Sequence, residues 1–172
     1  MDSEPGRDPG SDTGSEPRIV VVTVSTRAAS GEYTDRSGPA AVAALRELGY
    51  EVPDAKVVAD GEPVRAALEA AISEGADVIV TTGGTGLSSD DRTPDITREV
   101  VEREVPGVME AVRQFGREEG VATAALSRGV CGVVGTTLVV NLPGSTGGVR
   151  DGIGVLAPLL AHVIDQLAGE DH

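Results

Sequence analysis

Apolar runs alternate with amphipathic stretches along most of this chain. Residues 19–24 and 77–82 are largely apolar and rich in β-branched side chains, which is typical of strands covered on both faces. Residues 63–74, between them, carry apolar side chains at helical spacing, and Gly75 suits the end of a helix. This alternation of strands and helices with short links predicts a mainly parallel sheet.

The remaining elements follow the same alternation. A short strand is expected at residues 57–58, and further helices are expected at residues 37–49, 93–101, 106–115 and 145–167. Ser37 is expected to cap the first of these helices, and Pro158 is expected to kink the last one or divide it in two. Residues 130–134 and 137–141 predict an antiparallel hairpin. The predicted fold class is therefore α/β, a three-layer α/β/α sandwich with a mainly parallel sheet and one antiparallel hairpin.

The first 17 residues differ in composition from the rest of the chain. They are rich in Gly, Pro, Ser and Asp, and they contain no large aliphatic residue after Met1. Such a segment buries too little apolar surface to offset the entropy lost on ordering. We therefore expect a disordered acidic tail over residues 1–17 and a single α/β domain over residues 18–169.

Composition excludes several classes of function. The chain has 14 basic and 28 acidic residues, and its net charge of −14 opposes nonspecific binding to nucleic acid or to an anionic membrane. Cys131 is the single cysteine, which excludes a disulfide within the chain and a cysteine-rich zinc site, and its apolar neighbours indicate a packed core thiol. No apolar stretch is expected to reach the roughly 18 residues of a membrane span. Without a signal-peptide pattern, the expected compartment is the cytoplasm.

A glycine-rich segment follows the strand expected at residues 77–82. Residues 81–86 read TTGGTG, and Thr93 and Pro94 signal a helix start shortly afterwards. The backbone N–H groups of such a turn and the partial charge of a helix N-terminus favour a bound phosphate. Asp91 would repel that phosphate unless a cation lay between them, so the segment indicates a magnesium–nucleotide site. A plain turn from strand to helix accounts for the glycines alone equally well.

Other polar residues are expected at the same sheet edge, where ligands of such sheets gather. Ser25 and Arg27 follow the first strand, and Asp60 follows the second. Each has a structural alternative: Arg27 as a surface arginine, Asp60 as the N-cap of the helix that contains Pro63, and Asp91 as a solvated loop acid. Neither the P-loop pattern nor the dinucleotide pattern is present.

Four segments, taken together, resemble the molybdopterin adenylyltransferase family of molybdenum cofactor biosynthesis, the Mog/MoaB type, which is related to the gephyrin G domain. The segments comprise residues 25–38, 58–60, 81–95 and 141–145. The third, TTGGTG followed by Asp91 and by residues 93–95 (TPD), is close to a family signature. The resemblance extends from about Ile19 to Leu167.

The resemblance implies transfer of AMP from ATP to the terminal phosphate of molybdopterin, with release of pyrophosphate. The family's two important acids match Asp60 and Asp91, which are the expected catalytic residues and the tentative Mg²⁺ ligands. The residues expected to bind nucleotide or pterin are Ser25, Arg27, Thr82, Gly83, Gly84, Thr85, Gly86, Asn141, Pro143, Gly144 and Ser145. A homotrimer is expected, and a molybdenum-insertion protein is an expected partner.

Two other functional interpretations are compatible with the sequence. One is a non-catalytic molybdopterin-binding or scaffold protein of the same fold, and the other is an unrelated α/β phosphate-binding enzyme. The presence of both Asp60 and Asp91 favours the adenylyltransferase. Two departures from the family pattern weaken anion attraction: Asp90 stands where many relatives have Arg, and residues 146–148 lack the Lys found in some relatives.

Overall fold

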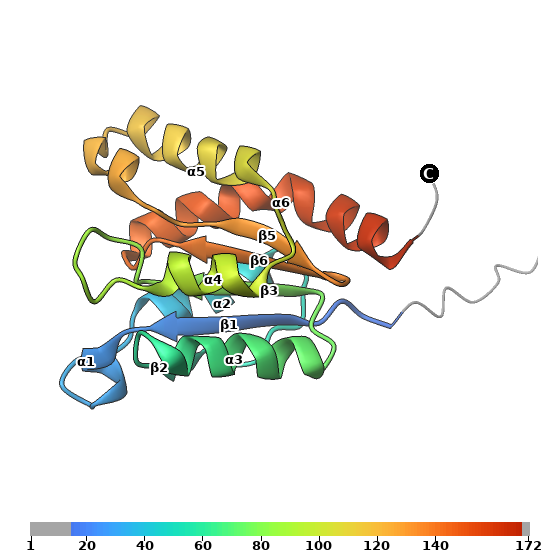
Figure 1. Ribbon diagram of the computed structural model, residues 1–172. Helices are drawn as coiled ribbons and strands as arrows, with labels where there is room; N and C mark the ends of the chain where they lie inside the picture. The colour runs from blue at the N-terminus through green and yellow to red at the C-terminus, as the bar shows by residue number, and fades with distance from the viewer. Residues whose placement is uncertain (1–14, 170–172) are drawn as a thin grey trace, which may run out of the picture.

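A six-stranded sheet organises the computed structural model, which describes residues 15–169 (Figure 1). The spatial order of the strands is β2-β1-β3-β6-β5-β4. In chain order they are β1 (Ile19–Val24), β2 (Lys56–Val58), β3 (Val78–Thr82), β4 (Arg103–Glu104), β5 (Cys131–Val134) and β6 (Thr137–Leu142). The first four in spatial order are parallel to one another, and β5 runs antiparallel to both β6 and β4. The predicted parallel sheet and hairpin are confirmed.

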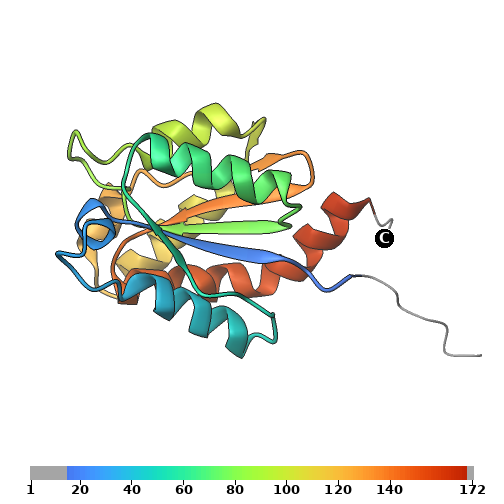
Figure 2. The same ribbon diagram turned by 90° about the horizontal axis from the view of Figure 1, so that it is seen from below.

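Helices cover both faces of this sheet, as the view in Figure 2 shows. The helices are α1 (Thr26–Ala29), α2 (Ser37–Glu47), α3 (Glu62–Ser73), α4 (Thr93–Val100), α5 (Pro106–Glu118), the 3₁₀-helix η1 (Ala122–Leu126) and α6 (Thr146–Ala168). Apolar residues of α2, α5 and α6 share one buried cluster with the sheet, and those of α3 and α4 share a second. The three-layer α/β/α class predicted from the sequence is therefore confirmed.

Alternate side chains of the central strands pack into the two buried clusters. In β3, Val78 and Val80 pack into the cluster beneath α2 and α6, whereas Ile79 packs into the cluster beneath α3. In β1, Val21 packs into the first of these clusters and Val22 into the second. Because both faces are buried, these strands carry mostly apolar, β-branched side chains on both faces, which explains the largely apolar runs in the sequence.

Several local expectations need correction. Ser37 is the first residue of α2 and not its N-cap; Arg36 is the N-cap and makes no side-chain cap bond. Instead, the Asp35 carboxylate accepts the Gly38 backbone N–H at 3.1 Å. Pro158 lies inside α6, which continues past it as one helix. The elements α1, β4 and η1 were not predicted, because each is too short to show a periodic pattern.

Helix α5 extends to Glu118, beyond its predicted end at residue 115. The predicted end falls directly before Gly116, a residue type that commonly follows the last turn of a helix. Here Gly116 lies within the helix, where an added Cβ would lie 2.7 Å from the Cβ of Ala124 in η1. Its missing side chain therefore lets η1 pack directly against α5.

Helix α6 qualifies as a membrane span by length and composition alone, contrary to the expectation from the sequence. In this structure α6 packs against α2, α5 and β6. Its buried side chains include Val149, Ile153, Leu156 and Leu160. These contacts make α6 a core helix of the sandwich. Of the predicted acidic tail, residues 1–14 lie outside the described residues.

Candidate active site

The glycine-rich loop leaves the carboxyl end of β3, and it lies at the same end of the molecule as α1 and the connection from β6 to α6 (Figure 1). The Gly83 backbone N–H donates to the Leu142 carbonyl oxygen at 3.0 Å, which joins the loop to the end of β6. Gly83 has a φ of +87°, and an added Cβ would lie only 2.3 Å from the Val24 carbonyl oxygen. Only glycine fits at this position, because the backbone of β1 occupies the space of a side chain.

Asp60 lies directly beside this loop. An added Cβ on Gly84 would lie 2.4 Å from Asp60 Oδ2 and 2.2 Å from Thr93 Oγ1. The Asp60 carboxylate accepts the Thr93 hydroxyl at 3.1 Å and the Arg92 backbone N–H at 3.2 Å. The N-cap of α3 is Gly61, which rules out Asp60 as the N-cap of that helix. Asp60 instead joins the end of β2 to the start of α4.

Asp91 lies beside the same loop, next to Gly86, which is two residues after Gly84. An added Cβ on Gly86 would lie 2.7 Å from Asp91 Oδ2, and this oxygen also accepts the Ser88 backbone N–H at 3.0 Å. The two acids therefore lie against Gly84 and Gly86, on a loop that leaves no room for side chains beside either carboxylate.

The donor chemistry of this pair suits Mg²⁺. The described residues contain no group of three or more His, Cys, Asp or Glu side chains placed to hold a metal ion. Mg²⁺ is usually held by one or two carboxylates together with substrate phosphates and water, and not by a cage made only of protein. Asp60 and Asp91 beside a phosphate-binding type of loop fit that pattern.

Two of the expected binding residues are fully buried. The Asn141 amide donates to Thr81 Oγ1 and to Thr97 Oγ1, both at 3.0 Å, and its oxygen accepts the Val130 backbone N–H at 3.1 Å. The Thr82 hydroxyl lies 2.8 Å from the Ser37 hydroxyl. Asn141 and Thr82 therefore support the base of the loop through bonds inside the core, and their side chains do not reach the surface.

Two hollows meet at the connection between β6 and α6. One has a volume of 460 Å³ and is lined by Thr85, Gly86, Pro143 and Ser145, together with apolar residues of α5 and η1. The other has a volume of 320 Å³, and its lining includes Ser25, Tyr33, Gly144 and Ser145. Ser145 lines both hollows and caps α6, since its hydroxyl accepts the Gly148 backbone N–H at 3.0 Å.

The predicted anion-binding residue Arg27 lies apart from both hollows. Its side chain is 74% exposed, lies 4.0 Å from the Glu32 carboxylate, and has its guanidinium carbon 6.0 Å from the centre of the Tyr33 ring. Ser25 caps the short helix α1, where its hydroxyl accepts the Ala28 backbone N–H at 3.1 Å. Of these two residues, only Ser25 lines a hollow.

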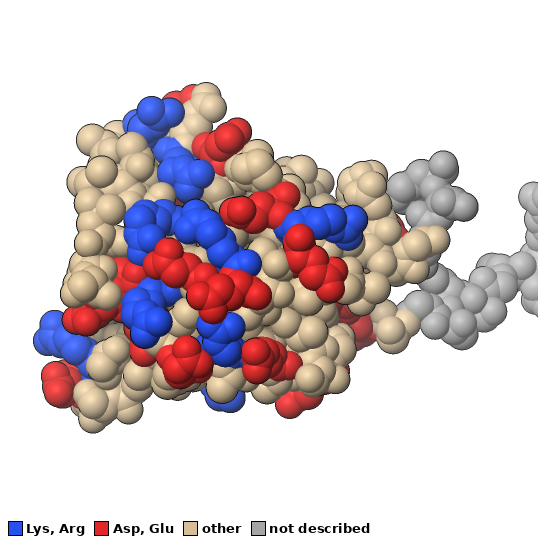
Figure 3. Space-filling view, viewed as in Figure 1, with Lys and Arg blue, Asp and Glu red and all other residues tan. Residues whose placement is uncertain are grey.

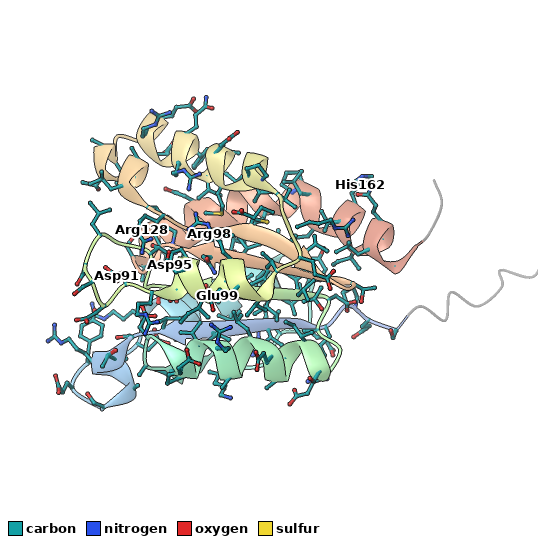
Figure 4. The ribbon with its side chains drawn as sticks, in the orientation of Figure 1. Asp91, Asp95, Arg98, Glu99, Arg128 and His162 are labelled. Atoms are coloured by element: carbon teal, nitrogen blue, oxygen red, sulfur yellow. The ribbon has the colours of Figure 1, made fainter. Side chains whose placement is uncertain are left out.

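Arg128 contacts the glycine-rich loop and was not predicted from the sequence. Its guanidinium donates to the carbonyl oxygens of Gly86 at 3.0 Å and Asp91 at 2.6 Å, and it pairs with the Asp95 carboxylate at 3.2 Å (Figure 4). Arg128 is 37 residues from Asp91 in the sequence, so no local pattern could link them. Elsewhere on this face, basic and acidic side chains are interspersed (Figure 3).

A family model described as "Probable molybdopterin binding domain" matches residues 20–162. The chain belongs to this family. The matched residues include the glycine-rich loop, both acids and the connection from β6 to α6, so the candidate site lies within the matched region.

Relatives and solved structures agree with this assignment. A Pyrococcus furiosus protein named molybdopterin adenylyltransferase is 34% identical over 151 residues, which cover 86% of this chain and 89% of that protein. A molybdenum cofactor biosynthesis bifunctional protein of Synechococcus elongatus is 43% identical over 155 residues, which cover 89% of this chain and 48% of that protein. The chain thus spans about half the length of such bifunctional relatives. The Mog protein structure from Mycobacterium ulcerans matches with a TM-score of 0.82 and 49% identity, covering 88% of this chain and 99% of that one.

Cys131 takes no part in the candidate site of this domain. Its side chain lies in the core cluster beneath α5 and α6, and burial raises the pKa of its thiol to about 12. The thiolate is therefore scarce at neutral pH, which excludes Cys131 as a nucleophile. The sequence-based interpretation of a packed core thiol is confirmed.

The ion pair between Asp95 and Arg128 gives the domain a pH dependence. The hydrogen bond from Arg128 lowers the pKa of the Asp95 carboxyl below its ordinary value of 3.8, and the charges of Arg128 and Arg98 act in the same direction. A lowered pKa in the folded state stabilises the fold above the ordinary pKa, and this contribution is lost as the pH falls through the lowered value.

We therefore expect Asp95→Asn to flatten the loss of stability on acidification. Urea unfolding between about pH 3 and pH 5 measures the free energy of unfolding across this range. The wild type should lose more of it than Asp95→Asn as the pH falls below the ordinary carboxyl pKa. The difference should be small, because the Asp95 side chain is 55% exposed. Identical slopes for the two proteins would contradict this assignment.

Proposed function

We propose that this protein transfers AMP from ATP to the terminal phosphate of molybdopterin and releases pyrophosphate. A terminal phosphate oxygen of molybdopterin attacks the α-phosphorus of ATP. The bond from that phosphorus to the β-phosphate bridging oxygen breaks, and pyrophosphate leaves with the electron pair. The observation that carries this proposal is the placement of Asp60 and Asp91 against Gly84 and Gly86 of one loop.

Charge neutralisation is the main chemical task in this reaction, because both reactants are anions. Bound Mg²⁺ would supply positive charge at the phosphates, and Asp60 and Asp91 are the residues that would hold it. The attacking phosphate is already ionised at neutral pH, so no general base is needed. Among the described residues, neither hollow is lined by histidine, which suits a reaction of this kind.

Alignment of the two substrates is the second task. Because the two hollows share Ser145, substrates held in them would present their phosphates to the same connection between β6 and α6. This connection leads into the N-terminus of α6, whose backbone N–H groups and partial positive charge favour phosphate. We propose that one hollow holds the nucleotide and the other the pterin.

The resemblance to Mog/MoaB proteins supports three further proposals. We propose that the protein is a homotrimer, that it acts in the cytoplasm, and that a molybdenum-insertion protein receives the adenylylated pterin. The name of the Pyrococcus furiosus relative, molybdopterin adenylyltransferase, supports the proposed reaction class.

Release of pyrophosphate separates this enzyme from a non-catalytic molybdopterin-binding or scaffold protein of the same fold. The purified protein is mixed with ATP, Mg²⁺ and molybdopterin, and pyrophosphate is measured with a coupled assay. We expect release only when all three are present. Binding of molybdopterin without any pyrophosphate release would favour the binding protein and overturn the proposed reaction.

A further inference from the structure

Arg128 holds both ends of the loop that carries Asp91. Its Nε donates to the Gly86 carbonyl oxygen at 3.0 Å, and its Nη2 donates to the Asp91 carbonyl oxygen at 2.6 Å. Its backbone N–H also donates to the Thr85 carbonyl oxygen at 2.9 Å. Arg128, in the segment before β5, therefore bonds to three carbonyl oxygens of this loop region, those of Thr85, Gly86 and Asp91.

The segment between those two ends is open to solvent. Residues 87–90 are exposed, and Leu87 is 68% exposed. The hydrogen bonds of this segment are internal: the Asp91 backbone N–H donates to the Ser88 carbonyl oxygen, and the Ser88 backbone N–H donates to the Asp91 carboxylate. The guanidinium thus connects an otherwise exposed loop to the body of the domain.

The partner of Arg128 on α4 completes this arrangement. The Asp95 carboxylate accepts hydrogen bonds from Nη1 and Nη2 of Arg128 at distances between 3.2 and 3.3 Å (Figure 4). A planar guanidinium presents its donors in a fixed fork, so it can satisfy two carbonyl oxygens and one carboxylate at once. Lysine has one ammonium group and cannot reach all of these acceptors in the same geometry.

Arg128 does not line either hollow of the candidate site as described. Its guanidinium is bonded to the Gly86 and Asp91 carbonyl oxygens and to the Asp95 carboxylate, so we expect its effect on the reaction to act through the loop that it holds. We propose that Arg128 is a positioning residue for adenylyl transfer, which fixes the Gly86–Asp91 loop so that the Asp91 carboxylate stays beside Gly86. The inference rests on the proposed function for its kinetic part and on the loop geometry alone for its structural part.

Arg128→Lys tests this inference with two independent measurements. We expect kcat for pyrophosphate release to fall about 100-fold, because a displacement of about 1 Å in an active-site group has effects of this size. The KM for molybdopterin should change little, while the Mg²⁺ concentration for half-maximal rate should rise. By NMR, hydrogen exchange of the Ser88 and Asp91 N–H groups should become at least about tenfold faster, because bonds from a charged donor are lost.

Arg98→Lys is the matched control. Arg98 pairs with the same carboxylate, Asp95, at 3.7 Å and with Glu104 at 3.5 Å, and both partners lie outside the Gly86–Asp91 loop. It should leave kcat, the Mg²⁺ requirement and the exchange of Ser88 and Asp91 close to wild type. A change as large as that of Arg128→Lys would overturn the inference, since a weakened ion pair with Asp95 would then explain both variants.

The outcomes separate this inference from the proposed function. Unchanged exchange of the Ser88 and Asp91 N–H groups in Arg128→Lys overturns the inference, whatever the activity. Faster exchange with unchanged kcat also overturns it, because the loop would then be free to move without consequence. If the wild type releases no pyrophosphate, the proposed function fails together with the kinetic part of the inference, whereas faster exchange in Arg128→Lys still supports the structural part, that Arg128 orders the loop.

Discussion

Asp91→Asn is expected to lower the rate of pyrophosphate release at least about 100-fold, since loss of one electrostatic contact to a charged transition state has effects of this size. The substitution removes the negative charge that would hold Mg²⁺ at the phosphates. Asn keeps an oxygen that can accept the Ser88 backbone N–H, so the loop bond of 3.0 Å can survive. The unfolding midpoint should therefore stay close to wild type, as measured by thermal unfolding alongside the coupled assay.

Asp90→Asn is the control for the loss of charge at Asp91. It removes the same charge from the adjacent residue, which is exposed; the three atoms nearest an added Cβ on Gly86 all belong to Asp91 and none to Asp90. Its turnover should stay near the wild-type value, or rise slightly, because a negative charge near the anionic substrates is removed. If Asp91→Asn keeps near-normal turnover, or if the two variants lose activity equally, the role assigned to Asp91 is wrong.

Gly83→Ala is expected to destabilise the fold by at least about 2 kcal/mol and to remove most of the activity. Two effects add at this position. A φ of +87° is strained for alanine, and the new Cβ would lie 2.3 Å from the Val24 carbonyl oxygen. A backbone oxygen in the central sheet cannot turn aside, so β1 and the loop must move apart. Urea unfolding gives the stability, and the pyrophosphate assay in the folded range gives the activity.

Gly107→Ala is the matched control for this substitution. Gly107 lies in the first turn of α5, has no positive φ, and has no atom within 4 Å of an added Cβ. Alanine also has the higher helix propensity, so stability should be equal or slightly greater. Wild-type stability in Gly83→Ala would show that the loop is not confined between β1 and β6, contrary to the structure.

The fold could be predicted because burial on both faces of the sheet requires largely apolar runs in the strands. The apolar runs of β1 and β3 and the helical spacing of α3 follow directly from the two packed clusters. Elements of two to five residues, such as α1, β4 and η1, carry no periodicity and depend on the surrounding structure. The predicted end of α5 fell short of Glu118, and Gly116 lies inside the helix, where its missing side chain admits η1.

The placement of the candidate residues at one sheet edge was predictable where these residues lie close in sequence. The glycines, Asp91 and the start of α4 lie within one segment, and Asp60 follows a strand that ends at the same edge. The sequence did not distinguish candidate side chains that are open to solvent from those that are buried in the core. Thr82 and Asn141 turn into the core and bond there. Arg128 reaches the loop across 37 residues of chain, a contact set only by the fold.

Transfer of the α-phosphate of ATP to molybdopterin is the measurement that tests the proposed reaction most directly. The protein is incubated with Mg²⁺, molybdopterin and ATP labelled at the α-phosphate, and the pterin product is separated and counted; a parallel sample carries the label at the γ-phosphate. We expect the α-label on the pterin in equal amount to the pyrophosphate released, and the γ-label only in pyrophosphate. Unlabelled pterin in the first sample, or γ-label on the pterin in the second, would contradict adenylyl transfer.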